Sequence, residues 1–393
     1  MAFDTTEHAE WDPLSPEAVD DPVLIQSRLR ASCPIAWTER SGGFWSIFRY
    51  GDIARVTRDP ATFAQGRPQR GNPRPPLEVN PPIHTAYRSV LHRYFTATAV
   101  GELESDVRAM VVERLNPLIE SGGGDFARSF TYPLPTQVVC RFLRLPPSST
   151  VLINRLSDEI YLNEEGRGEN PAAVAAAEAE LTDFAFAVVA ERRRLPEDPS
   201  RDLISGMIAA EIEGATLSDH QIVEVLRLLF VAGHNSTTSS LGICFLAMAR
   251  DGALQDRLRA QPELIGRAID EFLRLETPVM GMPRTVTKPT EIGSASLNPG
   301  DQLFLVWASA NRDASVFPEA DVCKIDRAPN KHMTFGRGIH ACIGRDLAEL
   351  ELRVACEELL ARSSHFELAA PSRRSSWVRF GVSSLHLRVK PAS

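Results

Sequence analysis

A cysteine near the C-terminal end of the chain lies in a loop that is rich in glycine. The segment reads Phe335-Gly-Arg-Gly-Ile-His-Ala-Cys-Ile-Gly344, and a helix is predicted directly after it, from Arg345 to Arg362. Backbone N–H groups and the positive end of a helix dipole favour the thiolate form of a cysteine at this place. The glycines permit close backbone approach and positive φ. The loop predicts a preorganised thiolate ligand at Cys342; the alternative is a buried, inert cysteine.

The bulk properties of the chain exclude several other classes. The remaining cysteines, at positions 33, 140, 244, 323 and 356, form no CxxC pair, which argues against a zinc ribbon or a disulfide framework. A formal net charge of −8 argues against a general nucleic-acid-binding surface. The acidic N-terminus has no signal-peptide pattern, and no apolar run is long enough to span a membrane. We therefore predict a cytoplasmic protein that contacts neither nucleic acid nor membrane.

Helical periodicity dominates the chain. Ser218 and Gln221 have the spacing of a capping box and predict a long helix that continues to about Ala249. A further helix is predicted between Pro262 and Pro278. The long helix is expected to cross the core, because its apolar residues cover more than one face: Ile222, Val225, Leu226, Leu229, Phe230 and Val231.

Strand signals occupy little of the chain. Residues 34–38 and 43–48 predict a short hairpin, and the residues after Pro371, including 377–389, predict a second one. Residues 65–82 contain six prolines and are a candidate lid loop. The expected fold is mainly α, helix-rich with a small β region. We expect a single catalytic domain over residues 1–393, with a flexible N-terminal segment over residues 1–20.

The cysteine loop resembles the haem-binding loop of the cytochromes P450. It matches their pattern F-G-x-G-x-H-x-C-x-G at every fixed position. The resemblance extends from the hairpin at Gly43 to the C-terminal hairpin, and several separate motifs follow the family's order. It implies the cytochrome P450 fold, haem b as cofactor, Cys342 as the ligand to the iron, and Phe335 and Gly344 among the haem contacts.

Two further sets of residues fit this resemblance. Glu271 and Arg274 are three apart on one predicted helix and share a face; they resemble the family's E-x-x-R signature, which implies a structural ion pair beneath the haem. Buried haem propionates need cationic or hydrogen-bonding partners. The resemblance implies four such residues: His84, Arg88, Arg284 and His340. For His84 and Arg88 alone, the alternative is a solvated helix face.

The long helix carries a third motif with two departures from the family. The segment from Ala232 to Thr238 resembles A-G-x-D/E-T-T, in which small residues leave room for dioxygen and an acid and a threonine guide protons. Here Asn235 replaces the acid and cannot ionise, and Ser236 keeps the hydroxyl without the β-branch. The catalytic candidates are Ser236, Asn235 and Thr237, and the haem-contacting candidates on this helix are Ala232 and Gly233. Alternatively, Asn235 and Ser236 only relieve unsatisfied carbonyls at a helix bulge.

The resemblance also implies a substrate pocket with an apolar lining. Its expected walls, which suit a small apolar ligand, are Leu229, Phe230, Ala232, Val279, Met280, Met282, Phe380 and Val382. Three arginines of the lid loop raise the possibility of a carboxylate on the substrate, although loop arginines are more often simply solvated: Arg67, Arg70 and Arg74.

Electrons are expected from outside the chain. No G-x-G-x-x-G motif is present, and about fifty residues follow Cys342, which leaves no room there for a flavin or iron–sulfur domain. The family's bacterial members suggest a ferredoxin and a ferredoxin reductase. Four basic residues are candidates for docking this partner: Arg93, Lys331, Arg337 and Arg345. The alternative is that they only make the surface soluble.

The favoured function is a haem-thiolate monooxygenase that hydroxylates or oxidatively dealkylates a small aromatic or terpenoid-like substrate with O2. Three alternatives stay open. The missing acid is compatible with a peroxygenase or a redox-neutral haem enzyme of the same fold. A haem or ligand carrier without turnover and a haem-free cysteine enzyme are the other two.

Overall fold

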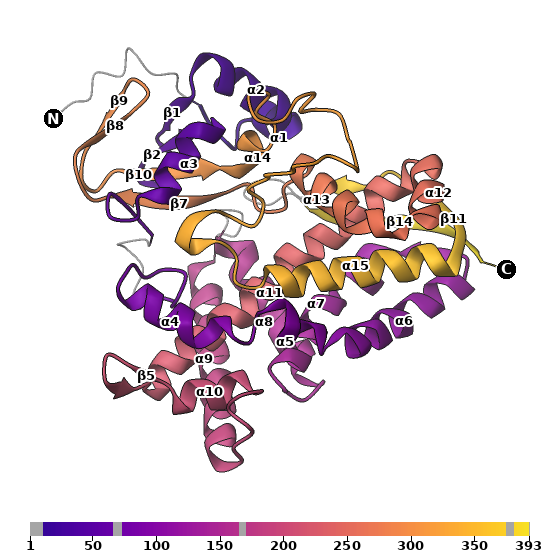
Figure 1. Ribbon diagram of the computed structural model, residues 1–393, viewed down its shortest axis with the longest axis horizontal. Coiled ribbons are helices and arrows are strands. Elements are labelled where there is room, and N and C mark those ends of the chain that lie inside the picture. The colour runs from indigo at the N-terminus through magenta and orange to yellow at the C-terminus, as the bar shows by residue number, and fades with distance from the viewer. Residues whose placement is uncertain (1–10, 66–72, 165–169, 375–380, 393) are drawn as a thin grey trace. The chain divides into compact units, whose positions relative to one another are not determined.

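The computed structural model describes residues 11–65, 73–164, 170–374 and 381–392 of the chain (Figure 1). Its contacts divide the chain into two units. The first unit comprises residues 1–71, 270–342 and 376–380, and the second comprises residues 72–269, 343–375 and 381–393. The chain passes repeatedly from one unit to the other, and the boundary after Ile269 falls inside helix α13.

Each unit has its own set of elements. The first unit contains α1 (Pro16–Asp20), α2 (Pro22–Ser32), β1 (Ile35–Thr38), β2 (Phe44–Ile47), α3 (Tyr50–Arg58), β3 (Phe63–Ala64), the second part of α13 (Ile265–Leu275), β7 (Gly281–Val286), β8 (Thr290–Ile292), β9 (Ala295–Leu297), β10 (Gln302–Val306) and α14 (Trp307–Ala310). The second contains α4 (Ile83–His92), α5 (Ala97–Gly101), α6 (Glu104–Glu120), β4 (Gly123–Asp125), the π-helical turn η3 (Ala127–Thr131), α7 (Pro133–Phe142), α8 (Ser149–Glu164), α9 (Pro171–Arg194), α10 (Leu203–Ala209), β5 (Glu211–Ile212), β6 (Ala215–Thr216), α11 (Asp219–Ala249), α12 (Gly252–Ala260), α15 (Arg345–Arg362), β11 (Ser363–Leu368), β12 (Arg373–Arg374), β13 (Val382–Ser384) and β14 (His386–Pro391).

The first unit is organised by a five-stranded sheet in the order β1-β2-β10-β7-β3. The predicted hairpin is confirmed: β1 and β2 pair antiparallel, with Trp37 opposite Trp45. Successive side chains of a strand point to opposite faces. Accordingly, Leu303 of β10 packs in the cluster that contains α3, and Phe304 packs in the cluster that contains residues of α2 and α14. Both faces of the sheet are therefore covered by helices.

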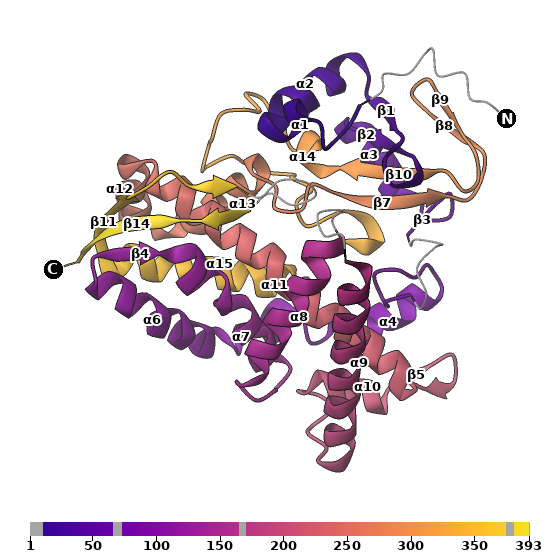
Figure 2. The ribbon, with the colours of Figure 1, turned by 180° about the vertical axis from the view of Figure 1, so that it is seen from behind.

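The second unit is organised by helix α11, which contacts α7, α9 and α15 (Figure 2). The predicted capping box is confirmed, since the Ser218 hydroxyl accepts from the Gln221 N–H at 3.3 Å and the Gln221 side chain accepts from the Ser218 N–H at 2.9 Å. Helix α11 is continuous to Ala249, without a bulge. Five of the six apolar residues expected to bury it are buried, and Leu229 is partly buried.

The C-terminal strands differ in part from the expected hairpin. Strands β12 and β13 do form an antiparallel pair. Strand β14 instead pairs with β11 and with β4, more than 250 residues earlier in the chain (Figure 2). Such a distant partner leaves no local signal in the sequence. The predicted helix over 345–362 is confirmed as α15, and the one after Pro262 appears as a 3-10 turn followed by α13.

The two loop predictions at the N-terminal side are partly described. Residues 16–20 of the expected flexible segment form α1, whereas residues 1–10 lie outside the described part of the chain. Residues 66–72 of the candidate lid loop are also outside it; residues 73–82 form turns before α4. None of the described helices is long and apolar enough to cross a membrane.

Candidate active site

The loop that carries Cys342 is closed by its own backbone. The Cys342 N–H donates to the Phe335 carbonyl at 2.7 Å, and the Ala341 N–H donates to the Gly338 carbonyl at 3.1 Å. Gly336 and Gly338 have φ of +71° and +75°, which L-residues with a side chain rarely adopt. Cys342 is exposed. The loop thus presents a thiol on a constrained backbone, as the sequence predicted.

The loop is also fixed to helix α3. A Cβ atom at Gly338 would collide with the Thr57 carbonyl oxygen, so only glycine fits at this position. The Arg337 guanidinium donates to the Tyr50 hydroxyl at 2.8 Å, and that hydroxyl donates to the Lys331 carbonyl at 2.9 Å. Arg337 therefore has a structural partner in the first unit, in addition to the docking role expected from the sequence.

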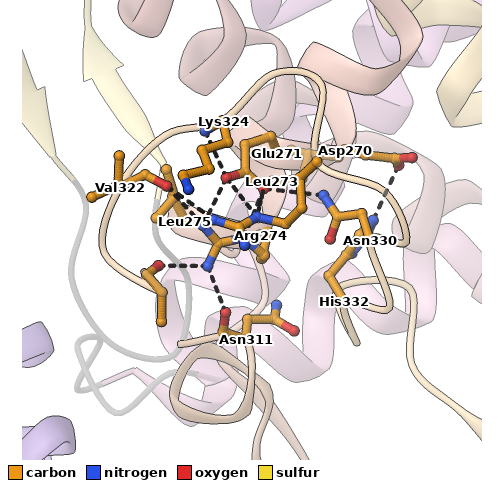
Figure 3. Close-up of polar contacts among 12 residues, drawn as sticks. Asp270, Glu271, Leu273, Arg274, Leu275, Asn311, Val322, Lys324, Asn330 and His332 are labelled. Carbon is orange, nitrogen blue, oxygen red and sulfur yellow. Dashed lines mark hydrogen bonds and ion pairs between the residues drawn. The ribbon is translucent and has the colours of Figure 1, made fainter. Parts of the chain in front are cut away.

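The predicted pair of Glu271 and Arg274 is present and fully buried (Figure 3). Arg274 donates to both carboxylate oxygens of Glu271, at 2.7 and 2.8 Å. Its remaining donors bind the carbonyls of Asn311 and Ala320 at 2.8 and 2.6 Å, and that of Val322 at 3.3 Å. One ion pair on α13 thereby anchors the irregular backbone that precedes the cysteine loop.

Two residues that the sequence did not single out complete this cluster. The Arg327 guanidinium donates to the Glu271 carboxylate at 3.0 Å, and the Asn330 amide donates to it at 3.1 Å. Burial alone would raise the pKa of Glu271, but hydrogen bonds from Arg274, the Lys324 N–H and Arg327 outweigh it and lower that pKa. Arg327 lies 56 positions from Glu271, so no helix spacing relates the two residues in the sequence.

Arg284 on β7 is a buried cation that fits an anionic group of a cofactor. It is 4% exposed and donates to the Pro283 carbonyl at 2.7 Å and to the Gln65 amide oxygen. Among the described residues, no carboxylate forms an ion pair with it, and burial lowers its pKa to about 10. A buried guanidinium without a counter-charge is costly. A carboxylate such as a haem propionate would offset that cost, and together with the exposed thiol this donor set fits haem b.

The other expected haem contacts are distributed over both units. In the second unit, His84 is buried and Arg88 is half-buried, one turn later on the same face of α4. In the same unit, Gly344 is the N-cap residue of α15. In the first unit, Phe335 and His340 belong to the cysteine loop and are half-buried. Their roles toward haem remain predictions.

The two small residues on α11, Ala232 and Gly233, have different surroundings. Ala232 is exposed, although Phe230, Val231 and His234 around it are buried. A Cβ atom at Gly233 would lie 2.6 Å from the Val139 side chain, so glycine here allows α11 to approach α7 closely. The sequence suggested that both residues leave room for dioxygen, but the packing against Val139 explains Gly233 without it.

The polar residues that follow them differ in their hydrogen bonding. The Ser236 hydroxyl donates to the Ala232 carbonyl, four residues back, at 3.0 Å. The side-chain nitrogen of Asn235 and the Thr238 hydroxyl are buried, and neither has a hydrogen-bond partner in the described part of the chain. Thr237 is 4% exposed. Because α11 is continuous here, no helix bulge requires Asn235 or Ser236.

The expected pocket residues occupy varied surroundings. Phe230 is fully buried against Phe184, with ring centroids 5.5 Å apart. Met280 and Val382 are buried, and Leu229, Val279 and Met282 are partly buried. Phe380, Arg67 and Arg70 lie outside the described residues, and Arg74 pairs with Glu78 at 3.3 Å.

The candidate docking cations belong to both units as well. Arg93 donates to the Tyr94 hydroxyl at 2.6 Å, and Arg345 pairs with Glu349 at 2.6 Å; Arg93, Arg345 and Lys331 are exposed. A shared docking surface for the four cations remains a prediction.

The comparisons with known proteins agree with this arrangement. The sequence model of the family described as cytochrome P450 matches residues 172–391. The chain is 31% identical over 377 residues to linalool 8-monooxygenase from Pseudomonas putida, which covers 90% of this chain and 91% of that protein. It is similar to the structure of cytochrome P450 CYP109Q5 from Chondromyces apiculatus, with a TM-score of 0.88, 29% identity and coverage of 98% and 99%. It is also similar to the structure of CYP109E1 from Bacillus megaterium in complex with testosterone, with a TM-score of 0.86 and 29% identity. That match covers 94% of this chain and 97% of the other.

The family model and the relatives identify the chain as a haem-thiolate oxygenase. The chain belongs to the cytochrome P450 family. It is a monooxygenase, its cofactor is haem b, and it uses O2 and electrons from a redox partner.

Replacing Arg284 by Gln tests the fit of the site to haem. We expect haem to dissociate about 10- to 150-fold faster, since a hydrogen bond to a charged group contributes about 1.5–3 kcal/mol. The apoprotein should be as resistant to urea as the parent or more so, because the variant no longer buries an unpaired cation. Transfer of haem to excess apomyoglobin measures the rate. Arg55→Gln, on the exposed face of α3, is the control; equal rates in both variants would contradict the assignment.

Proposed function

We propose that this protein hydroxylates or oxidatively dealkylates a small apolar substrate with electrons from a ferredoxin. The observation that carries the proposal is the Cys342 thiol on its closed loop, which suits a thiolate ligand to haem iron. When bound, haem b supplies the chemistry that transfers an oxygen atom from O2 to a C–H bond. The protein supplies the thiolate, the propionate partners and protons.

The residues that we propose for binding haem are those expected from the sequence. Cys342 would ligate the iron, and Arg284 would form a charge-assisted hydrogen bond to a propionate. His84, Arg88 and His340 are the further propionate partners that we propose. Phe335, Ala232, Gly233 and Gly344 would contact the haem through apolar atoms and backbone.

Ser236 and Asn235 are the residues that we propose for proton handling. The Ser236 hydroxyl donates a hydrogen bond to the Ala232 carbonyl, so its oxygen lone pairs are available to accept another one. A buried donor without a partner costs about 1–3 kcal/mol, so the Asn235 amide and the Thr238 hydroxyl favour a water molecule between them. They lie three residues apart and share a face of α11. This water would replace the ionisable acid as the neighbour of Ser236.

Replacing Ser236 by Ala should uncouple turnover. We expect product formed per NAD(P)H to fall about tenfold or more, since positioned proton transfer contributes about 10²–10⁴-fold, and hydrogen peroxide to replace the product. Ser240→Ala is a matched control, because the Ser240 hydroxyl makes the same bond to a carbonyl four residues back, at 2.9 Å. If both variants lose coupling equally, the serine only satisfies a helix carbonyl.

Apolar residues and the names of the relatives support the proposed substrate class. The proposed walls Leu229, Val279, Met280 and Met282 offer only apolar atoms and adaptable thioethers. One relative is named for its action on linalool and another was solved with testosterone, both compact apolar molecules. Titration of the ferric protein with small aromatics, terpenoids and carboxylic acids tests this proposal. A saturable shift of the Soret band toward high spin with the apolar members is expected, and a response to carboxylic acids alone would contradict it.

A peroxide-driven or redox-neutral reaction is the second candidate, because Asn235 stands in place of the acid. Product formed with ferredoxin, ferredoxin reductase and NAD(P)H supports the monooxygenase. Product formed only with hydrogen peroxide supports the alternative. A cytoplasmic location stays a prediction.

A further inference from the structure

His332 and Asp270 form a partly buried polar contact outside the residues assigned so far. The His332 side chain is 3% exposed, and its Nε2 lies 3.1 Å from a carboxylate oxygen of Asp270 on α13 (Figure 3). Asp270 immediately precedes Glu271 but points to a different partner. Three residues after His332, Phe335 begins the cysteine loop.

The hydrogen bonds of His332 define its tautomer. The Thr334 backbone N–H donates to His332 Nδ1 at 3.3 Å, so Nδ1 has to be the unprotonated nitrogen. The carboxylate of Asp270 can only accept from Nε2, which therefore carries the proton. His332 is thus held between a carboxylate on a helix and a backbone N–H of the segment that leads into the loop.

The imidazole also contacts the start of the cysteine loop. The rings of His332 and Phe335 are 6.0 Å apart, with an interplanar angle of 51°. Phe335 in turn accepts the hydrogen bond from the Cys342 N–H at 2.7 Å. The Thr334 hydroxyl in addition donates to the Leu273 carbonyl at 2.9 Å. A continuous series of contacts therefore leads from Asp270 through His332 and Phe335 to the backbone of Cys342.

We propose that His332, oriented by Asp270, is a positioning residue for the Cys342 thiolate. The imidazole sets the ring of Phe335 and the N–H of Thr334, and through them the conformation that the loop needs to present sulfur to the iron. The inference rests on the proposed role of Cys342 as the haem ligand. It concerns the retention of thiolate ligation and makes no claim about the substrate.

Four variants of the haem-loaded protein separate the two functions of the imidazole. His332→Asn keeps an acceptor near the position of Nδ1, His332→Gln keeps a donor near Nε2, and His332→Phe keeps only the ring. Asp270→Leu removes the orienting carboxylate from a side chain that is 29% exposed. The readout is the red-shifted ferrous–carbonyl band, which reports thiolate ligation, followed over time together with the reduction potential.

We expect the red-shifted band of His332→Phe to decay about tenfold faster than that of the parent, with a changed reduction potential. His332→Asn should recover most of the stability of the band, whereas His332→Gln, which lacks the acceptor for the Thr334 N–H, and Asp270→Leu should resemble His332→Phe. If His332→Phe yields no folded protein, Asp270→Leu carries the test alone. The matched control is His386→Phe, which removes an exposed histidine 3.8 Å from Asp125.

The proposal is overturned if Asp270→Leu and His332→Phe keep the parent's band, decay rate and potential. It is also overturned if they only lower the unfolding midpoint while the band under native conditions is unchanged, since that result describes a purely structural histidine. Absence of the red-shifted band in the parent protein would instead contradict the assignment of Cys342, so the two failures are distinguishable.

Discussion

Replacing Cys342 by Ser is expected to abolish the red-shifted ferrous–carbonyl band and to reduce monooxygenase turnover to background. A serine hydroxyl has almost the size of the thiol but does not donate the electron density through which a thiolate favours cleavage of the O–O bond. The loop backbone should persist, because its closing hydrogen bond uses the N–H of residue 342 and the Phe335 carbonyl. The variant is therefore expected to fold and to retain weakened haem binding.

The spectrum of the reduced, carbon monoxide-treated protein measures this outcome. Cys323→Ser is the appropriate control, because Cys323 is also exposed and also belongs to the first unit. An unchanged band in Cys342→Ser would exclude Cys342 as the ligand. Loss of the band in both variants would point to a general effect of cysteine replacement.

The second large effect is expected on stability, from Glu271→Gln. The change removes the counter-charge of Arg274 and Arg327, whose guanidinium groups both bind the Glu271 carboxylate within a buried site. Leaving a buried charge uncompensated costs about 3–5 kcal/mol. That is a large part of a typical free energy of unfolding of about 5–15 kcal/mol. Urea titration of the haem-bound protein, followed by circular dichroism and by the Soret band, measures the loss.

A pair of the same spacing on a surface helix provides the control. Glu191 and Arg194 of α9 are also three residues apart, at 2.7 Å, but are largely exposed. Glu191→Gln should leave the unfolding midpoint unchanged, because water already solvates both groups. Equal midpoints for Glu271→Gln and the parent would show that the buried pair contributes nothing beyond packing.

The same pair predicts the direction of the pH dependence. The pKa of Glu271 is lowered in the folded protein from the ordinary value of 4.5. The stability that the ionised Glu271 carboxylate contributes is therefore fully present above pH 4.5. It is lost as the pH falls from there through the lower pKa of the folded protein. The difference in unfolding free energy between the parent and Glu271→Gln should accordingly shrink on acidification.

Local patterns predicted the elements whose signals lie within a few residues. The capping box at Ser218 and the apolar residues of α11 are neighbours in the chain, and the aromatic and β-branched residues of the first hairpin pair across a short turn. The Cys342 loop was predictable for the same reason, since its glycines, histidine and cysteine fall within ten residues. Each of these features is determined by local backbone geometry.

Contacts between distant segments could not be predicted in this way. The bond of Arg327 to Glu271, the bond of Arg284 to Gln65 and the pairing of β14 with β4 join residues with no common spacing. Gly233 illustrates a different limit. Its small size fitted an expected role toward dioxygen, but the Val139 side chain, which no local pattern relates to it, supplies a packing reason.

The backbone between α14 and the cysteine loop contains no regular helix or strand. A surface loop of that kind is usually the place where related proteins gain or lose residues. Here, however, the carbonyls of Asn311, Ala320 and Val322 all accept hydrogen bonds from one buried side chain, that of Arg274. The bonds to Arg274 thus restrict the length of this segment. An inserted or deleted residue would move these carbonyls away from the guanidinium, just as it would shift the register of a paired strand.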